Sequence, residues 1–466
     1  MSWQLAVGRW PLLMFTPWPP ARTGVAHYAS MLVPALRKRI DVEVISQRPT
    51  VNSQPGPRIY QLGNNPHHEW IYREAMQTPG TIVLHEIVLH HLIVEMTLAR
   101  GDLDGYVDAL RANHGEAGAA WARGRAAGLH SEMGNFLMPA SIELARRSRG
   151  VIVHNRYAAE RLRSFGVTTP IHQVVHPFDA HPEAAARRDE IRARLGYAPN
   201  ERVIGFFGFV TAAKRPEVIV EAFARARRVE PTLRLLVVGE PAPNVNLDLF
   251  RGEGITFTGY MPDEEFPPFV AAVDRLVNLR YPSAGEASGI LMRALDAGKP
   301  VAVSDYGPFA EFPDECVVKI PFDREIDALV EFFAGEVPDR SAVQRRWIEE
   351  NATVDAAADG YVRALKQARR ESAGVTRSLP LFPRLEATLR NGRIILRNIG
   401  DFTLRTRTYG QPAYRVIVNG EWRELPRDLP PGAETEIAAP NARPITLIHA
   451  LQGVPLVDDQ PFAVLP

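Results

Sequence analysis

Short apolar runs alternate with helix-length amphipathic segments in two successive blocks of this chain, and this alternation constrains the fold more than any other feature. The runs are nearly continuous in apolar side chains, as expected of parallel strands that are covered on both faces. Parallel neighbours need a crossover connection, which a helix supplies. The sequence therefore predicts an α/β protein with two doubly wound domains that face one another, and a ligand between them.

The first block predicts a domain at residues 1–178 and the second a domain at 179–371. Strands of the first block are expected at 12–16, 42–46, 59–62, 81–84, 150–154 and 171–176. Helices between them are expected at 25–36, 88–100, 103–111, 116–127 and 138–147. The second block predicts strands at 203–208, 234–239, 255–258, 275–279 and 301–304, and helices at 216–228, 264–272, 288–297 and 356–370.

The last part of the chain changes character after a linker at 372–383 that is rich in Ser, Thr, Gly and Pro. Two Asn-Gly pairs, at 391–392 and 419–420, are each flanked by short strand-like runs, which is a strong signal for a two-residue hairpin. Residues 384–466 are therefore expected to form a small antiparallel β domain without catalytic residues.

The charge balance excludes several classes of partner. The 466 residues contain 54 basic and 54 acidic side chains, so neither nucleic acid nor a strongly anionic membrane is indicated as the main partner. A single cysteine, Cys316, allows no intramolecular disulfide and fits a reducing cytoplasm. No apolar run is long enough to span a bilayer. We expect a cytoplasmic protein, with peripheral membrane contact through a basic helix face left open.

Residues 280–307 combine a turn, a helix start and a strand around one carboxylate. Ser288 is placed to cap the helix, and Gly298 with Pro300 ends it. A helix start at the carboxyl edge of a parallel sheet is a natural position for an anion such as a phosphate. Glu286 has two interpretations there: a carboxylate that stabilises the helix start, or an acceptor of hydrogen bonds from sugar hydroxyls while the helix start receives phosphates.

Four segments in order resemble glycosyltransferase family 4, the retaining enzymes of the two-domain GT-B fold with Rossmann-like halves. They are PPARTGVAHYASMLVPAL, FFGFVTAAKRPEVIVEAF, LLVVGE and GEASGILMRALDAGKPVAVSDYGPFAE, and the resemblance covers roughly residues 1–370. The implied roles are an acceptor-side domain at 1–178 and a domain at 179–371 that binds the nucleotide-sugar donor.

The resemblance implies the residues that bind the donor diphosphate. Gly24 matches a glycine that lets the backbone approach the diphosphate, although a plain helix-entry glycine is the alternative. Lys214 matches the lysine that pairs with the diphosphate, against the alternative of a solvated loop lysine. The family's arginine five positions earlier is replaced by Phe209, which leaves the diphosphate to Lys214, helped by Arg215 and by helix N-termini.

The resemblance also implies the sugar contacts. His85, at the end of the fourth strand, matches a histidine near the donor sugar. Glu286 matches the first of two paired glutamates, with Gly285, Ser288 and Gly289 around it as further donor contacts. The second glutamate is missing, because its place falls on Ala294 or Arg293, and Asp296 is a weak substitute. We name Glu286, His85 and Lys214 as the catalytic residues.

We therefore expect a glycosyltransferase that moves a sugar from a UDP- or GDP-linked donor to a glycan or lipid-linked acceptor with retention. We expect it to need no metal and no other cofactor. A metal cluster of Glu86, His90 and His91 matches no motif that binds metal through a known mechanism. The alternatives are a nucleotide-sugar-binding protein without turnover, motivated by Phe209 and the missing glutamate, and an isomerase of the same architecture, which needs further acid and base carboxylates.

Overall fold

The computed structural model describes the chain from residue 11 to 374, with gaps at 22, 49–55, 130–131, 179 and 263–264. Beyond this point it describes residues 385–390, 393–399, 403–404, 406–408, 411–412, 414–418, 421–438, 445–449 and 454–455. The chain divides into two compact units, Met1–Arg370 and Glu371–Pro466. Each unit is described here by itself.

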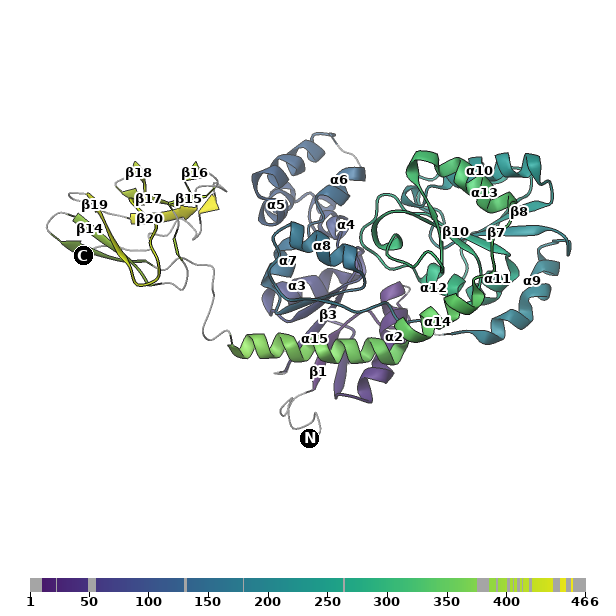
Figure 1. Cartoon of the computed structure of the whole chain (residues 1–466), viewed down its shortest axis with the longest axis horizontal. Helices are drawn as coiled ribbons and strands as arrows, with labels where there is room; N and C mark the ends of the chain where they lie inside the picture. Colours follow the sequence, from purple (N-terminus) through teal and green to yellow (C-terminus); the bar gives the residue numbers. More distant parts are fainter. Residues whose placement is uncertain are drawn as a thin grey trace. The chain divides into compact units, whose positions relative to one another are not determined.

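The first block forms a six-stranded parallel sheet in the order β2-β1-β3-β4-β5-β6. Figure 1 labels β1 and β3 of this sheet. Its strands are β1 (Leu12–Phe15), β2 (Val42–Ile45), β3 (Arg58–Leu62), β4 (Thr81–Leu84), β5 (Gly150–Val153) and β6 (Ile171–Gln173). Its helices are α2 (Gly24–Arg37), α3 (Glu69–Gln77), α4 (His90–Met96), α5 (Leu103–Ala126), α6 (Glu132–Leu137), α7 (Ile142–Arg147) and α8 (Arg156–Ser164).

The second block forms another six-stranded parallel sheet, in the order β12-β11-β10-β7-β8-β9. Its strands are β7 (Arg202–Phe207), β8 (Leu233–Val238), β9 (Ile255–Phe257), β10 (Arg275–Asn278), β11 (Val301–Ser304) and β12 (Val318–Ile320). The helices that follow β6 are α9 (Arg188–Arg194), α10 (Pro216–Val229), α11 (Phe266–Ala272), α12 (Gly289–Asp296), α13 (Glu325–Ala334), α14 (Ser341–Asn351) and α15 (Val354–Gly374). The predicted α/β class with two doubly wound sheets is confirmed.

Apolar side chains fill both faces of each sheet, which explains the continuous apolar runs. In β1, Leu13 and Phe15 pack into one core cluster, while Leu12 and Met14 pack into the cluster on the opposite face. In the second sheet, the buried apolar side chains of β7, β8, β10 and β11 likewise alternate between two core clusters, one on each face. Because successive side chains of a strand point to opposite faces, burial on both faces requires an unbroken apolar run.

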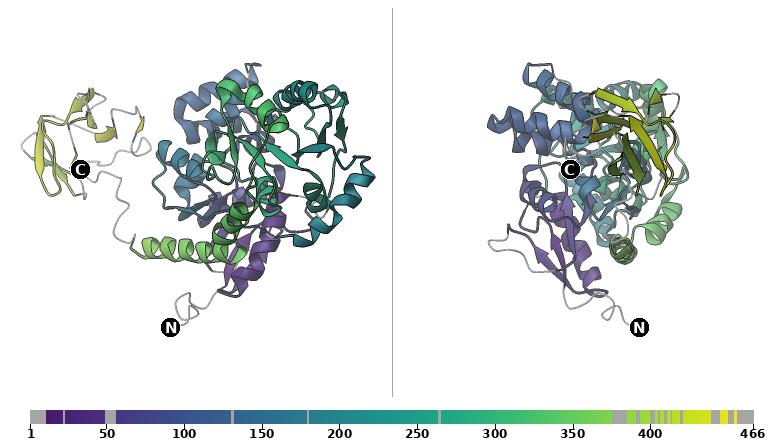
Figure 2. Two further views of the ribbon diagram at one scale, coloured as in Figure 1. Left: turned by 45° about the vertical axis from the view of Figure 1, so that its right-hand side comes forward. Right: turned by 90° about the vertical axis from the view of Figure 1, so that its left-hand side faces the viewer.

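The last helix of the first unit packs on the first sheet rather than the second. Tyr361 of α15 is buried in the same core cluster as Tyr28 and Leu32 of α2, and the hydroxyl groups of Tyr28 and Tyr361 are 2.8 Å apart. Figure 2 shows α15 running beside the purple N-terminal elements. The chain thus returns to the first sheet after completing the second, so α15 joins the two halves.

Several predicted elements differ in their bounds. The expected helix at 88–100 is α4 followed by a separate 3₁₀ turn, Leu98–Arg100. The helices expected at 103–111 and 116–127 form α5, interrupted at Gly115, whose φ of 66° is not helical. The helix expected at 138–147 starts at Ile142, and α6 precedes it. Residues 372–374 of the expected linker are helical, and its remainder lies outside the described residues.

The second unit is antiparallel, as predicted. One sheet contains β13 (Leu385–Arg390), β14 (Arg393–Asn398) and β19 (Glu434–Ala438). Another contains β18 (Glu421–Glu424), β17 (Tyr414–Val418), β20 (Ile445–His449) and β21 (Val454–Pro455). A third consists of β15 (Arg407–Thr408) and β16 (Gln411–Pro412). Both predicted hairpin pairs, β13–β14 and β17–β18, are present. The Asn-Gly turns at 391–392 and 419–420 lie outside the described residues.

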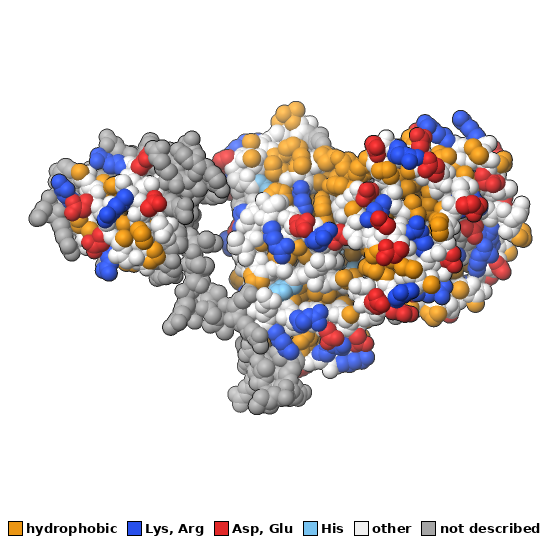
Figure 3. Space-filling model, viewed as in Figure 1, with side chains coloured by type: hydrophobic (Ala, Val, Ile, Leu, Met, Phe, Trp, Pro, Cys, Tyr) orange, Lys and Arg blue, Asp and Glu red, His pale blue; other side chains and the backbone are white. Residues whose placement is uncertain are grey.

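Side chains of both signs are mixed on the surface of the first unit. On the face shown in Figure 3, Lys and Arg side chains lie among Asp and Glu side chains, in line with a net charge of zero. Among the described residues, no helix combines the length and the apolar character that crossing a bilayer requires.

Candidate functional site

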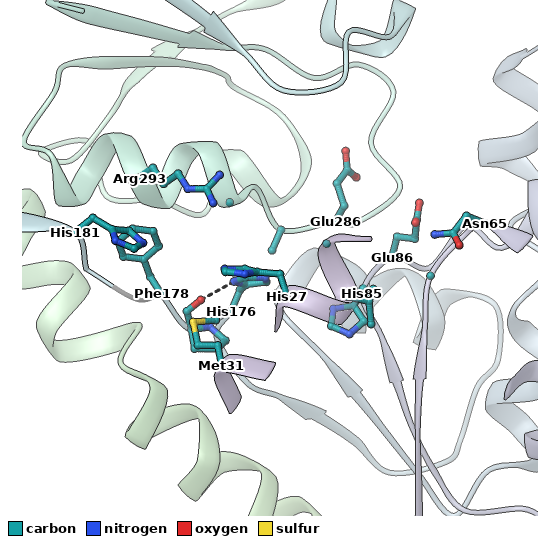
Figure 4. A pocket seen from close by; sticks show the side chains of 16 residues that line it. His27, Met31, Asn65, His85, Glu86, His176, Phe178, His181, Glu286 and Arg293 are labelled. Atoms are coloured by element: carbon teal, nitrogen blue, oxygen red, sulfur yellow. Dashed lines mark hydrogen bonds between the residues drawn. The ribbon is translucent and has the colours of Figure 1, made fainter. Parts of the chain in front are cut away.

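A cavity of about 330 Å³ lies between the two sheets of the first unit, at the carboxyl ends of their strands (Figure 4). Residues from α2, from the ends of β3 and β4, from the segment that connects the two sheets and from the start of α12 line it. They are Gly24, Val25, His27, Met31, Gly63, Asn65, His85, Glu86, His176, Pro177, Phe178, His181, Glu286, Ala287, Gly289 and Arg293. This is where ligands bind in open α/β folds.

Two helix starts border the cavity. Thr23 caps α2 by accepting a hydrogen bond from the backbone N–H of Ala26 (3.0 Å), and Gly24 is the first residue of that helix. Ser288 caps α12 through the N–H of Leu291 (3.2 Å), which confirms the predicted cap. A Cβ added at either Gly24 or Gly289 would meet no atom within 4 Å. Both predicted donor contacts therefore leave open space at the cavity.

Glu286 lines the cavity, but its carboxylate is engaged within its own loop. Arg280 Nε donates to Oε1 (2.8 Å), while Ser283 Oγ (2.9 Å) and the N–H of Ala284 (2.8 Å) donate to Oε2. A carboxylate with three such donors is held firmly in one orientation. The contact between Glu286 and sugar hydroxyls stays a prediction, and the geometry shows in addition that Glu286 shapes the turn.

The turn that carries Glu286 also binds the first domain. The backbone carbonyl of Gly285 accepts from Asn155 Nδ2 (2.8 Å), and that of Ala284 accepts from the N–H of Ile87 (2.8 Å). Gly285 has a φ of 76°, and a Cβ there would lie 3.2 Å from Ala158 Cβ. Glycine is thus required for both the backbone conformation and the close approach. Gly285 serves this contact and is absent from the cavity lining.

The two predicted diphosphate cations lie outside the cavity lining. Lys214 is 7% exposed, and its Nζ donates to the carbonyl of Phe207 (2.8 Å). Burial, followed by the charge of Arg280, lowers the pKa of Lys214 well below its ordinary value. Arg215 pairs with Glu325 (2.5 Å between Nη2 and Oε2). The guanidinium of Arg215 is therefore held by Glu325, and its help with the diphosphate stays a prediction.

His85 lines the cavity, and both of its ring nitrogens are engaged inside the first domain. Its Nε2 lies 2.6 Å from Gln61 Oε1 and its Nδ1 lies 3.1 Å from His154 Nε2, while His154 Nδ1 lies 2.9 Å from the carbonyl of Val174. Burial lowers the pKa of His85 well below its ordinary value, and that of His154 to about 4. At neutral pH His85 is an uncharged part of the cavity wall.

Glu86 and Arg293 are cavity residues that the sequence reasoning did not select as site residues. Glu86 accepts one hydrogen bond, from the N–H of Asn64 to Oε1 (3.0 Å), and burial raises its pKa to about 7. Arg293 lies one helical turn after Gly289 and is the one Arg or Lys among the described residues that line the cavity. The i, i+4 spacing on α12 could have identified Arg293.

His90 and His91 do not converge on a common point. His90 Nε2 lies 2.6 Å from the hydroxyl of Tyr106, in the core, whereas His91 is exposed and lies 3.8 Å from Glu95. Within the described residues, no group of three or more His, Cys, Asp or Glu side chains is arranged to hold a metal ion.

The sequence similarity to a known family lies in the second domain. Residues 201–331 match the family described as glycosyl transferases group 1. The D-inositol 3-phosphate glycosyltransferase of Rhodococcus erythropolis is 35% identical over 130 residues, which is 26% of this chain and 29% of that protein. The 2-deoxystreptamine glucosyltransferase of Streptomyces kanamyceticus is 30% identical over 195 residues, 40% of this chain and 45% of that protein.

A solved structure extends the comparison to the fold of both domains. The sucrose-phosphate synthase from Thermosynechococcus elongatus aligns over 78% of this chain and all of its own, with a TM-score of 0.52 and 15% identity. At that identity the likeness concerns the fold. The chain spans less than half the length of the two curated relatives named above. Residues 201–331 are thus similar to glycosyl transferases of group 1, within a fold that resembles the GT-B glycosyltransferases.

Proposed function

We propose that this protein is a glycosyltransferase that moves a sugar from a nucleotide-sugar donor to a hydroxyl acceptor, with the donor in the cavity between the two sheets. The observation that carries the proposal is the placement of two helix starts and the Arg293 guanidinium on one cavity. The start of α12 and Arg293 lie within residues 201–331, which match group 1 glycosyl transferases. Together these groups favour a dianionic diphosphate.

The chemistry follows from the charge of the leaving group. A nucleoside diphosphate that leaves an anomeric carbon develops negative charge, which Arg293 and the starts of α2 and α12 can stabilise. Lys214 remains a proposed diphosphate contact, because its Nζ carries a further N–H besides the one that it donates to the carbonyl of Phe207. In the proposed reaction the acceptor hydroxyl attacks on the departing face and passes its proton to the diphosphate, with retention and without a metal ion.

The substrates are proposed from the resemblance: a UDP- or GDP-linked sugar as donor, and a glycan or lipid-linked glycan as acceptor. Two relatives carry the names of D-inositol 3-phosphate and 2-deoxystreptamine, so these compounds belong among the acceptors to be tested. A cytoplasmic location with peripheral contact at the membrane is part of the same proposal.

A second candidate is a nucleotide-sugar-binding protein without turnover. Phe209, where the family resemblance expects an arginine, is 55% exposed, and Ala294, one of the two positions expected for a second glutamate, is fully buried. Glu286 is already engaged by three donors of its own loop. These three features remove contacts that transfer would use, while they leave the cavity intact.

Release of the nucleoside diphosphate separates the two candidates. The purified full chain is incubated with UDP-glucose, UDP-N-acetylglucosamine or GDP-mannose, with and without the acceptors named above, and free UDP or GDP is measured. We expect release from at least one donor, unchanged by EDTA. Binding of UDP or GDP without release from any donor favours the second candidate, and the absence of any nucleotide binding contradicts both.

A further inference from the structure

The cavity carries two carboxylates from opposite domains, and they differ in how many protein donors they already serve. Glu286 enters from the turn before α12 and accepts from Arg280, Ser283 and Ala284. Glu86 enters from the end of β4 and, among the described residues, accepts from the N–H of Asn64 at Oε1. Its Oε2 therefore has acceptor capacity that the described protein does not use.

The position of Glu86 suits a contact with the bound sugar. It follows His85 directly, and Figure 4 shows Glu86 and Glu286 at one end of the cavity, with Arg293 and His181 toward the other end. If the diphosphate occupies the Arg293 end, the sugar attached to it extends toward the two glutamates. An ionised carboxylate accepts strong hydrogen bonds from hydroxyl groups.

We propose that Glu86 binds the transferred sugar: its carboxylate accepts hydrogen bonds from hydroxyl groups of the donor sugar, a role that the occupied side chain of Glu286 cannot carry alone. This inference rests on the proposed function, because it places the sugar of a nucleotide-sugar donor in the cavity. It assigns a binding residue on the first domain, whereas the sequence motifs place the acidic sugar contact on the second.

The charge of Glu86 depends on its surroundings within the cavity. The pKa of Glu86 is raised to about 7, mainly by burial; the Asn64 N–H lowers this pKa, the charge of Glu286 raises it and the charge of Arg280 lowers it. Burial lowers the pKa of His176 to about 3 and that of His85 well below its ordinary value, which favours the uncharged form of both rings. His27 and His181 also line the cavity.

The experiment compares dissociation constants of wild type and Glu86→Gln for UDP-glucose and GDP-mannose, and for UDP and GDP, at pH 6 and pH 8. A carboxyl with a pKa of about 7 goes from about one-tenth to about nine-tenths ionised over this range. Protonated Glu86 resembles glutamine, so we expect similar sugar-nucleotide affinities at pH 6. At pH 8 the wild type should bind the sugar nucleotide about tenfold more tightly than Glu86→Gln does. Wild type and Glu86→Gln should bind UDP with equal affinity, and likewise GDP.

Two further variants secure the assignment. Glu86→Asp keeps the charge and should retain a pH-dependent preference for the sugar nucleotide. Glu95→Gln, which changes a glutamate of α4 outside the cavity, should behave as wild type. Thermal unfolding checks that each variant is folded, and Glu86→Asp provides the test if Glu86→Gln does not fold.

Each remaining outcome overturns the inference in a distinct way. Equal sugar-nucleotide affinity of wild type and Glu86→Gln at both pH values shows that Glu86 does not touch the sugar. Equal losses for UDP and UDP-glucose place its effect on the nucleotide or on the cavity as a whole. A pH dependence that persists in Glu86→Gln shows that it arises from a group other than Glu86. Failure of the wild type to bind any nucleotide or nucleotide sugar defeats the proposed function together with this inference.

Discussion

The two sides of the cavity use their charged side chains differently. On the second domain, the Glu286 carboxylate at the cavity is paired with Arg280, and outside the cavity lining Arg215 is paired with Glu325 and Lys214 donates to the Phe207 carbonyl. On the first domain, Glu86 accepts one backbone hydrogen bond and has a raised pKa. Of the two cavity carboxylates, the one in the recognisable sequence motif is therefore the more internally satisfied.

This difference shows that a motif residue can build a site without presenting its charge to the ligand. Glu286 holds the turn that contacts Asn155 and Ile87 of the first domain, and the turn in turn borders the cavity. The following variants test the contrast between a structural role on the second domain and an open, titratable group on the first.

Glu286→Ala should have the largest effect. It leaves Arg280 without its carboxylate in a partly buried pair, with side chains 12% and 23% exposed, and the loss should approach the roughly 3–5 kcal/mol of a broken buried pair. Urea unfolding measures the loss. Glu160→Ala, which breaks an exposed pair with Arg156, should cost less than about 1 kcal/mol. An unchanged stability of Glu286→Ala contradicts the structural role.

Arg293→Ala should weaken binding of UDP or GDP without a large change in stability. A hydrogen bond to a charged group contributes about 1.5–3 kcal/mol, which corresponds to a loss of about 10- to 150-fold in affinity. Isothermal titration calorimetry measures it, and Arg293→Lys should recover part of the loss. Wild-type affinity in Arg293→Ala removes Arg293 from the diphosphate site.

Glu86→Gln should stabilise the protein at high pH and leave it unchanged at low pH. Burial raises the pKa of Glu86 from the ordinary 4.5 to about 7, so its contribution to stability is present below pH 4.5 and is lost as the pH rises to 7. The variant cannot ionise, and at pH 8 it should exceed the wild type by about 1–3 kcal/mol. Urea unfolding at pH 4.5 and pH 8 measures this, and a pH-independent difference contradicts it.

Tyr28→Phe should give the smallest effect, about 1 kcal/mol, because it removes one buried hydrogen bond between α2 and α15. A double-mutant cycle with Tyr361→Phe measures the coupling. We expect the double variant to lose less than the sum of the two single losses, since neither hydroxyl is then left without its partner. Strict additivity would show that the 2.8 Å contact contributes nothing to the docking of α15.

Much of the fold was accessible from the sequence because its signals are local. Continuous apolar runs such as 81–84 are required by burial on both faces of a sheet, and Asn-Gly pairs favour hairpins wherever they occur. The cap at Ser288 follows from a hydroxyl just before an apolar helix. The interruption of α5 at Gly115 and the packing of α15 on the first sheet have no comparable local signal.

The sequence by itself determined the alternating architecture, the antiparallel second unit and the segments that border the cavity, because short-range periodicity and turn chemistry encode them. The tertiary structure decided which charges remain available to a ligand. Glu86 and Glu286 lie far apart in the sequence, and their hydrogen-bond donors become known only when each loop is folded. The free energy of a buried charge depends on those partners, so no residue pattern could rank the two carboxylates.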